Sequence, residues 1–407
     1  MSIAVNSKAH GLTNSIKRTC MIDSFSVENY RSFARKQDIE LRPLTLFFGW
    51  NSGGKSSLLR FLPLLAESIK VNGPPIWLSG PVGRHATWPS LVSKATGRGG
   101  LSFSLGFDSN GSKLAEWKVN GDLEGRWQEI ESLKFEAVEL ARSELGSKGL
   151  LPNSDHGSNS EFTILRDVLK NISEQVQWIS GVRSRAPRVV TYGGGSSATL
   201  NPDGTDVVEH LISAQLRSSV DPILEATQNF FAAMGEQMVL DNPVTGVWRL
   251  LLHPTGGPQV RVDLCDTGEG YSQVLPVLVA LARAQAGGPR LLCLEQPELH
   301  LHTKAQVELA RQLVCAAKSK TAPRILVETH SEILLTSVQL AIANGDIDAD
   351  MVRVYWVESR SDGTSDAVSI GFNEKGQPDS SALSGAFGEA LRLGQELMKK
   401  QLRMAKR

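Results

Sequence analysis

The sequence predicts an α/β fold with a mixed β-sheet core and flanking helices. A short apolar strand pattern runs into a glycine-rich loop, and an apolar helical pattern follows that loop directly. Two later apolar runs, Leu291–Glu295 and Arg324–Glu328, have the length of buried parallel strands, and each ends in an acidic residue. Strands that deliver polar groups to one edge of a sheet are typical of α/β proteins that bind ligands at that edge.

The composition is that of an ordinary globular protein without net charge. The chain has 407 residues, enough for two or three domains, and lysine plus arginine equal aspartate plus glutamate at 43 each. This balance excludes a strong overall positive field for nucleic acid, although it leaves a local basic patch open. Four scattered cysteines without a C-x-x-C pair indicate reduced thiols, which suits the cytoplasm.

The sequence indicates neither a membrane span nor a secretory signal. No apolar stretch has the length needed to cross a bilayer, so we expect no membrane partner. Residues 1–20 are polar and lack the apolar segment of a signal peptide. We therefore expect a cytoplasmic protein in which residues 1–20 form a disordered leader.

Residues 21–127 are expected to form the first half of the main domain. Apolar patterns with a period of two indicate strands within residues 22–48, at Leu101–Phe107 and around Ala115–Val119. The last strand of the first group leads into the glycine-rich loop. A helix with a dense apolar face is expected from Ser57 onward.

The glycine-rich loop fits the phosphate-binding pattern G-x-x-x-x-G-K-[ST]. Residues 49–56 read Gly-Trp-Asn-Ser-Gly-Gly-Lys-Ser. The glycines let several backbone N–H groups point at one anion, and the helix that follows adds its positive end. Lys55 is expected to reach the β- and γ-phosphates and Ser56 to hold Mg²⁺. The residues predicted to bind the nucleotide here are Gly49, Asn51, Ser52, Gly53, Gly54, Lys55, Ser56 and Ser57.

Residues 128–178 are expected to form a small inserted helical subdomain. Charged residues alternate with apolar ones at helical spacing over residues 128–145, and a polar loop follows. A second helix is expected over Glu161–Trp178. The pair is too short for a long coiled coil.

Residues 179–370 are expected to complete the main domain, and residues 371–407 to form a helical tail with a basic end. The basic stretch Ile179–Arg188 is either a solvated loop or a contact for phosphate or nucleic acid. Helices are expected at Asp206–Leu216 and Asp221–Phe231, and paired strands at Trp248–His253 and Val260–Leu264.

Three further motifs in this half carry chemistry. Residues 266–273 place two glycines and a serine before an apolar helix, which fits either a glycine turn that caps a core helix or a second anion site at the helix N-terminus. The strand Leu291–Glu295 delivers a carboxylate to its C-terminal end. The strand Arg324–Glu328 is followed by His330, which is placed to sense a γ-phosphate.

Taken together, these motifs resemble ABC-type ATPases of the RecF/SMC/OLD-like group, loosely grouped with the AAA ATPases. The resemblance covers roughly residues 21–369 and rests on motifs in a matching order. These are Glu28–Phe33, the phosphate loop Gly49–Ser56, a signature loop at Asp266–Gln273, a Walker B strand with D-loop at Glu295–His302, and the switch-histidine segment Glu328–Ser331. It implies an ABC ATPase-like head.

The resemblance assigns a role to each motif. It implies that Ser56 and Glu295 hold Mg²⁺, with Glu295 as the Walker B acid, and that His330 is the switch histidine. Ser272 with Gly270 would contact the γ-phosphate of ATP bound on a second subunit. This arrangement implies a homodimer joined head to tail through two bound ATP molecules.

The sequence departs from the family pattern at the catalytic position. Gln296 stands where the catalytic glutamate usually follows the Walker B acid. An amide can orient a water but cannot act as a general base, so Glu298 becomes a candidate substitute and turnover is expected to be slow. The inserted segment is also far too short for an SMC-like arm, and no C-terminal nuclease domain is evident.

Three functions are consistent with this reading. The first is a cytoplasmic ATPase whose ATP-driven dimer senses DNA and controls a separate effector, a nuclease or toxin. Stand-alone members of this group often serve bacterial anti-phage defence, which is an argument from family association alone. The second is a RecF-like DNA repair ATPase. The third is a scaffold that binds ATP without hydrolysing it.

Overall fold

A computed structural model gives the structure of the protein over nine segments. It describes residues 21–71, 73–96, 99–107, 113–122, 124–141, 149–151, 160–218, 220–256 and 260–385. The predicted leader at residues 1–20 and most of the predicted helical tail lie outside these described residues.

A central six-stranded sheet runs through the middle of the molecule in the order β16-β15-β3-β14-β13-β8. Its strands are β3 (Leu44–Gly49), β8 (Val176–Ile179), β13 (Leu291–Glu295), β14 (Arg324–Thr329), β15 (Val352–Ser359) and β16 (Ser365–Ile370). All neighbours are parallel except β15 and β16. The parallel strands therefore end at one common edge, where a ligand site is expected.

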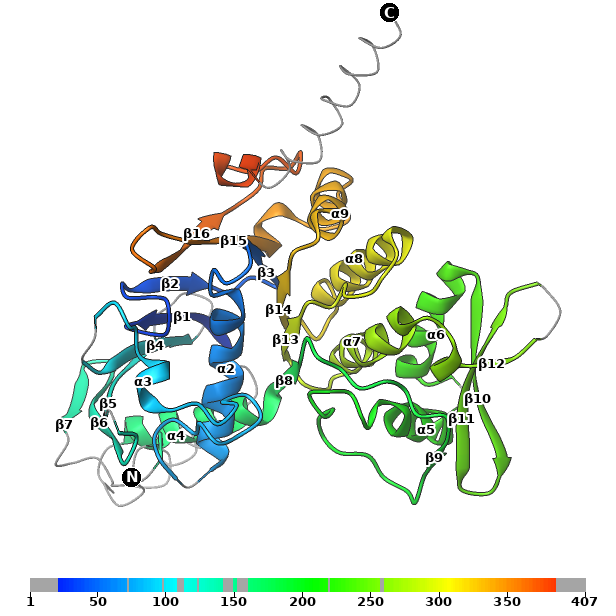
Figure 1. Cartoon of the computed structure of the whole chain (residues 1–407), viewed down its shortest axis with the longest axis horizontal. Coiled ribbons are helices and arrows are strands. Elements are labelled where there is room, and N and C mark those ends of the chain that lie inside the picture. The colour runs from blue at the N-terminus through cyan, green and yellow to red at the C-terminus, as the bar shows by residue number, and fades with distance from the viewer. Residues whose placement is uncertain are drawn as a thin grey trace, which may run out of the picture.

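Alternating side chains of the central strands feed two separate hydrophobic cores. Leu292 and Leu294 belong to one core, whereas Leu291 and Cys293 belong to the other. Helix α2 (Lys55–Lys70) covers the second face, and α7 (Glu269–Gln285), α8 (Thr303–Ala317) and α9 (Glu332–Ala343) cover the first (Figure 1). Apolar residues on both faces explain why these strands appear in the sequence as continuous apolar runs.

A second six-stranded sheet is antiparallel and packs against the outer side of α2. Its order is β2-β1-β4-β5-β6-β7, with β1 (Ile22–Glu28), β2 (Gln37–Glu40), β4 (Leu101–Phe107), β5 (Lys113–Gly121), β6 (Gln128–Phe135) and β7 (Val138–Ala141). The strands predicted at Leu101–Phe107 and Ala115–Val119 are confirmed.

The helix predicted over residues 128–145 is wrong where the structure describes it, because β6 and β7 occupy residues 128–141. A β-bulge explains the error. Ser132 pairs with Lys118 and Ile130 pairs with Val119, so Glu131 is an extra residue in β6. The bulge puts Ile130 and Leu133, three residues apart, on the buried side of the sheet. That spacing imitates a helix in the sequence.

The second helix of the predicted insertion is present but ends earlier than expected. Helix α4 covers Ser160–Gln175 and packs on α2, and the next residues form β8 at the edge of the central sheet. The β-branched and aromatic residues of Val176–Ile179 suit a strand, and all of them are buried.

A third part of the molecule, called the third lobe below, combines a four-stranded sheet with helices. It contains β9 (Val190–Thr191), β10 (Glu236–Val244), β11 (Val247–Pro254) and β12 (Val262–Asp263), with α5 (Val207–Arg217) and α6 (Pro222–Met234). The helices predicted at Asp206–Leu216 and Asp221–Phe231 are confirmed within one to three residues, and so is the pairing of the two predicted strands. Short helical segments at Trp88–Leu91 (α3), Leu264–Asp266 (η2), Ala349–Met351 (η3) and Ser381–Gly385 (η4) complete the fold.

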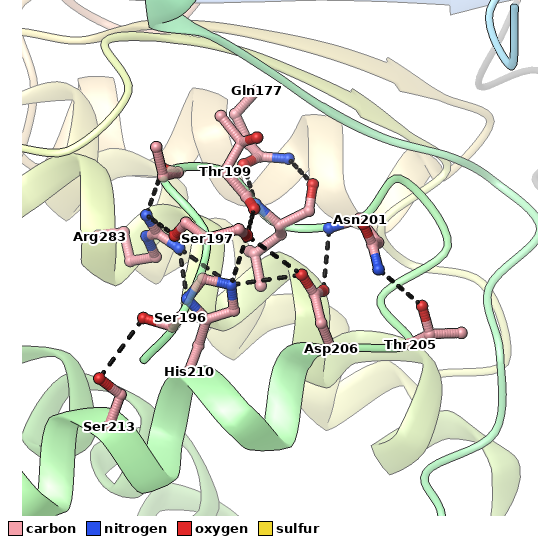
Figure 2. Close-up of polar contacts among 12 residues, drawn as sticks. Gln177, Ser196, Ser197, Thr199, Asn201, Thr205, Asp206, His210, Ser213 and Arg283 are labelled. Carbon is pink, nitrogen blue, oxygen red and sulfur yellow. Dashed lines mark hydrogen bonds and ion pairs between the residues drawn. The ribbon is translucent and has the colours of Figure 1, made fainter. Parts of the chain in front are cut away.

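A polar cluster fastens the long connector between β8 and α5 to the third lobe (Figure 2). Gln177 of β8 forms two hydrogen bonds with the backbone of Leu200. Arg283 of α7 donates to the carbonyl of Ala198 and to the ring of His210 on α5. These bonds hold the connector across α5 and α7. None of the described helices is both long enough and apolar enough to cross a membrane.

Candidate nucleotide site

The phosphate-binding loop joins β3 to α2 at the common edge of the central sheet. Gly49 has a φ of 144° and Gly54 a φ of 103°, a region that side chains disfavour. A Cβ atom at Gly49 would lie 2.2 Å from the carbonyl oxygen of Val357, and one at Gly54 would lie 2.6 Å from Ser32 Oγ. The loop therefore needs glycine at both positions for its backbone to curl under a ligand.

Lys55 begins α2 and turns its amino group back into the loop. Lys55 is buried, with 3% of its surface exposed to solvent. Its Nζ atom donates to the carbonyl oxygens of Gly49 at 3.1 Å and Trp50 at 2.6 Å. Burial lowers the pKa of Lys55 from its ordinary value, and the carboxylates of Glu328 and Glu298 partly oppose this effect. Among the described residues, no carboxylate forms an ion pair with Lys55, so its charge is available to an anionic ligand.

Trp50 lies on the outside of the same loop. Trp50 is exposed, with 60% of its surface accessible to solvent. Its ring contacts the ring of Trp356 on β15 edge-on, and the two ring centroids are 6.0 Å apart. This aromatic contact connects the loop to the neighbouring strand.

A cavity of about 520 Å³ opens over the loop. Most of the residues predicted from the sequence to bind nucleotide line it, together with residues from the turn after β1, the segment after α3 and the ends of β13 and β14. The lining residues are Arg31, Ser32, Asn51, Ser52, Gly54, Lys55, Ser56, Ser57, Ser90, Val92, Ser93, Lys94, Ala95, Gln296, Glu328, His330 and Gly363.

Glu328 is the site residue that sequence reasoning missed. It lines the cavity at the end of β14, and Ser56 Oγ donates to its Oε1 at 2.7 Å. Its Oε2 atom is buried without a hydrogen-bond partner, and burial raises the pKa of the carboxyl group. A usable signal was present in the sequence, because Glu328 ends an apolar strand just as Glu295 does.

Glu295 is engaged elsewhere. Arg60 of α2 forms a two-pronged ion pair with it, and Trp178 Nε1 donates to its Oε1 at 2.7 Å. The carboxylate does not line the cavity. The carboxylate that accepts a hydrogen bond from Ser56 is therefore that of Glu328. The sequence had placed Ser56 together with Glu295 instead.

Gln296 lies in the cavity wall in a strained conformation. Its φ is 41°, a left-handed value that a non-glycine residue adopts only when its surroundings enforce it. Its N–H donates to the carbonyl of Glu328 at 2.8 Å, and its carbonyl accepts from Arg183 Nη2 at 2.7 Å. These two backbone bonds fix the residue at the predicted catalytic position.

Glu298 supports the switch segment rather than facing the cavity. Its Oε1 accepts hydrogen bonds from Thr329 Oγ1 at 2.7 Å and from the N–H of His330 at 3.0 Å, and burial raises the pKa of its carboxyl group. It does not line the cavity, so the geometry disfavours the predicted role as general base. His330 does line the cavity, and burial together with the Lys55 charge lowers the pKa of its imidazole.

The predicted signature loop is partly helical and lies outside the cavity. Helix α7 already starts at Glu269, and Ser272 is 5% exposed inside its first turn. A contact from the Ser272 side chain to another molecule is not consistent with this burial. Gly270 packs closely, since a Cβ atom there would lie 2.5 Å from the carbonyl oxygen of His300. The exposed residues at the start of this helix are Gly268 and Glu269.

In the basic stretch at residues 179–188, Arg183 is buried, whereas Arg185 and Arg188 are exposed and form ion pairs at the surface. Arg183 is buried, which lowers its pKa to about 10. Arg185 pairs with Glu269, and Arg188 pairs with Asp266 at 2.6 Å. Of the two alternatives left open by the sequence, a solvated loop describes Arg185 and Arg188, whereas Arg183 is buried.

The cavity fits a nucleotide with Mg²⁺ better than a protein-held metal. Among the residues that the structure describes, no group of three or more histidine, cysteine, aspartate and glutamate side chains could hold a metal ion. Mg²⁺ usually binds through one or two protein oxygens plus substrate phosphates, and the Ser56 hydroxyl with the open oxygen of Glu328 offers such a pair.

Comparisons with known proteins agree with this geometry. Residues 242–336, which contain the signature, Walker B and switch segments, match the family model described as "AAA domain, putative AbiEii toxin, Type IV TA system". The search of curated proteins gave no match.

Three solved structures that are similar to this chain are SMC heads. One, bound to the C-winged helix domain of ScpA, is 14% identical with a TM-score of 0.52, and the match covers 86% of this chain and 98% of the other. The head from Pyrococcus furiosus is 11% identical over 93% and 100% of the two chains (TM-score 0.49). The head from Thermotoga maritima is 13% identical over 85% and 98% (TM-score 0.44). With the first of these, the phosphate loop and the central sheet identify a P-loop fold of the kind found in the ABC ATPase heads of SMC proteins.

Proposed function

We propose that this protein is an ABC-type P-loop ATPase that binds ATP with Mg²⁺ and hydrolyses it. The observation that carries the proposal is the buried Lys55, whose amino group donates, within the described part of the chain, to two carbonyls of its own loop and to no carboxylate. Such a lysine at a helix N-terminus supplies positive charge to an anion above the loop. The similarity of the fold to an SMC head supports the same conclusion.

In this proposal the chain's own residues bind and orient the reactants. Lys55 and the backbone N–H groups of the loop bind the phosphates, and Ser56 presents its hydroxyl to Mg²⁺. Bound Mg²⁺ would neutralise charge on the phosphate oxygens. Gln296 orients the attacking water from the cavity wall, and His330 faces the terminal phosphate. Because an amide cannot take a proton, hydrolysis is slow.

The direct test compares two lysine variants on the same helix. Lys55→Ala should lower ATP affinity by up to about 100-fold, because it removes a charge-assisted contact worth up to roughly 3 kcal/mol. Lys70→Ala, at the exposed end of α2, should bind ATP like the wild type. Calorimetric titration with ATP, combined with thermal melting, makes the measurement. Equal affinity in both variants would contradict the phosphate-loop assignment.

We also propose that ATP and Mg²⁺ promote a head-to-tail homodimer. The motivation is the N-terminus of helix α7, where Gly268 is exposed and the positive end of the helix dipole favours an anion from a second molecule. A Cβ atom at Gly268 meets nothing within 4 Å, so Gly268→Trp changes this surface without disturbing the fold. Light scattering should detect ATP-dependent doubling of mass in the wild type and its loss in Gly268→Trp. Doubling in both proteins would exclude this surface.

The cellular role we propose is a sensor or regulator in a DNA-related process, with anti-phage defence through a separate nuclease or toxin as its setting. The matched family description names a toxin of a toxin–antitoxin system, which supports a setting with more than one component. Copurification from the native host should recover that component. RecF-like DNA repair is the alternative if no effector copurifies.

A specific observation favours one competing function. Gln296 at the catalytic position suits a scaffold that binds ATP as a clamp without turning it over. Steady-state phosphate release distinguishes this scaffold from an ATPase, because the scaffold should dimerise with ATP and release no phosphate above the Lys55→Ala background.

A further inference from the structure

Glu295 at the end of β13 and Glu328 at the end of β14 differ in whether a carboxylate oxygen is left without a hydrogen-bond donor. We propose that Glu328, and not the Walker B residue Glu295, supplies the carboxylate that faces the divalent cation accompanying the nucleotide. Glu295 then acts as a positioning residue that holds α2 against β8. This inference rests on the proposed nucleotide binding and adds to it the identity of the cation-side acid.

Both oxygens of Glu295 are already occupied. Oε1 accepts from Arg60 Nε and Trp178 Nε1, and Oε2 accepts from Arg60 Nη2 at 2.5 Å and from the N–H of Gly181 at 3.3 Å. The Arg60 guanidinium also lies over the Trp178 ring at 5.8 Å. A cation reaching Glu295 would have to displace Arg60, whose side chain is only 13% exposed, and leave that charge without its partner, which costs free energy.

The carboxylate of Glu328, in contrast, has few hydrogen-bond donors around it. It accepts one hydrogen bond, from Ser56 Oγ, and its second oxygen is buried without any partner. A buried carboxylate oxygen with no donor is unfavourable unless a bound ion or water satisfies it. Glu328 lines the cavity, and its carboxylate contacts the Ser56 hydroxyl, the group that a phosphate loop uses for Mg²⁺.

The order of the central strands explains why Glu328 is the nearer acid. Strand β14 lies directly between β3, which feeds the loop, and β13. In the parallel register Glu328 pairs with both Phe47 of β3 and Glu295 of β13. Neighbouring strands are about 4.8 Å apart, so an acid on β13 is one strand spacing farther from the loop than the same position on β14.

The decisive experiment measures how strongly Mg²⁺ improves nucleotide binding. ADP affinity is determined by calorimetry with Mg²⁺ and with EDTA for the wild type, Glu328→Gln, Glu295→Gln and Glu308→Gln. Glu308 is a buried glutamate on α8 that is paired with Arg311 and lies outside the cavity, so it controls for the chemical change itself. Mn²⁺ electron paramagnetic resonance with ADP reports cation binding without any turnover.

Glu328→Gln should lose at least about 10-fold of the Mg²⁺ enhancement and weaken Mn²⁺ binding, since it removes a charged oxygen ligand. The glutamine oxygen can still accept from Ser56, so this variant is expected to fold. Glu295→Gln should keep the enhancement, as should Glu308→Gln. Thermal melting identifies any variant that fails to fold, and the Glu328→Gln result decides the question without Glu295→Gln.

Full Mg²⁺ enhancement in Glu328→Gln would overturn the inference while leaving nucleotide binding established. Lost turnover with intact cation binding in that variant would also overturn it, because Glu328 would then act on the attacking water. A wild type that binds no nucleotide with or without Mg²⁺ would overturn the proposed function together with the inference.

Discussion

Glu295 and Glu328 occupy paired positions on adjacent parallel strands, and both are buried. Around Glu295, an arginine, an indole and a backbone N–H fill the carboxylate's acceptor positions. Around Glu328, a single serine hydroxyl donates and one oxygen is left open. An acid at a strand end therefore does not define a ligand by itself; the donors that the rest of the fold brings to it decide whether it holds structure or binds a ligand.

The cluster around Arg283 and His210 shows the same contrast farther from the loop. A cavity of about 400 Å³ adjoins it, and the cluster includes cationic and hydroxyl groups (Figure 2). Yet among the described residues no buried side-chain atom of Arg283, His210 or Asp206 lacks a hydrogen-bond partner. We interpret this cluster as a fastening for the connector, because its groups are already satisfied.

The largest expected effect separates the two acids by stability. Glu295→Ala should lower the free energy of unfolding by about 3 kcal/mol, because Arg60, whose side chain is only 13% exposed, loses its ion-pair partner. Glu328→Ala should cost far less, since only the Ser56 hydroxyl loses a partner. Urea unfolding of both variants makes the comparison. Equal losses would mean that the two carboxylates do similar structural work.

The next effect concerns the residue between the two acids. Gln296→Glu should raise turnover by about 100-fold, because it places a general base on the cavity wall where the wild type has an amide. The wild type should turn over more slowly than about 1 per second. Steady-state phosphate release measures both proteins. A fast wild type that Gln296→Glu does not improve would show that another group, with Glu298 as the first candidate, takes the proton.

The smallest expected effect is a pH-dependent difference in stability between the wild type and Glu328→Gln. Burial raises the pKa of Glu328 in the folded protein, so the folded state holds its proton more tightly than the unfolded state. The wild type therefore loses stability as pH rises through the folded pKa, whereas glutamine does not titrate. Glu328→Gln should stabilise the nucleotide-free protein by on the order of 1 kcal/mol at pH 7.5.

This difference should disappear below about pH 4, where the unfolded carboxyl group is also protonated. Melting temperatures of the two proteins across that range provide the measurement. A stabilisation that is independent of pH would point to packing rather than to the buried charge.

Local chemistry made the phosphate loop predictable, because its glycines and its lysine are required within a few consecutive residues. The apolar strands at Leu291–Glu295 and Arg324–Glu328 were predictable for the same reason, since burial on both faces leaves a continuous pattern. What could not be predicted depends on contacts between distant residues. The bulge at Glu131 exists only through its pairing with β5.

The roles of the acids show the same limit. Arg60 and Trp178 reach Glu295 from 235 and 117 residues away, and no spacing in the sequence announces either contact. The motif order supplied a Walker B position, but the strand order placed Glu328 closer to the loop. Ser272 likewise fits the motif by spacing, and only the early start of α7 shows that it is buried.

The exposed ring of Trp50 gives the protein an optical reporter at its phosphate loop. Its indole meets solvent on one side and Trp356 on the other, so its emission depends on the position of the loop backbone. A ligand that draws Lys55 away from the Trp50 carbonyl should alter that emission. Subtracting the spectrum of Trp50→Phe isolates this signal from the rest of the 8 tryptophans. Loop occupancy can then be followed in stopped flow without any label.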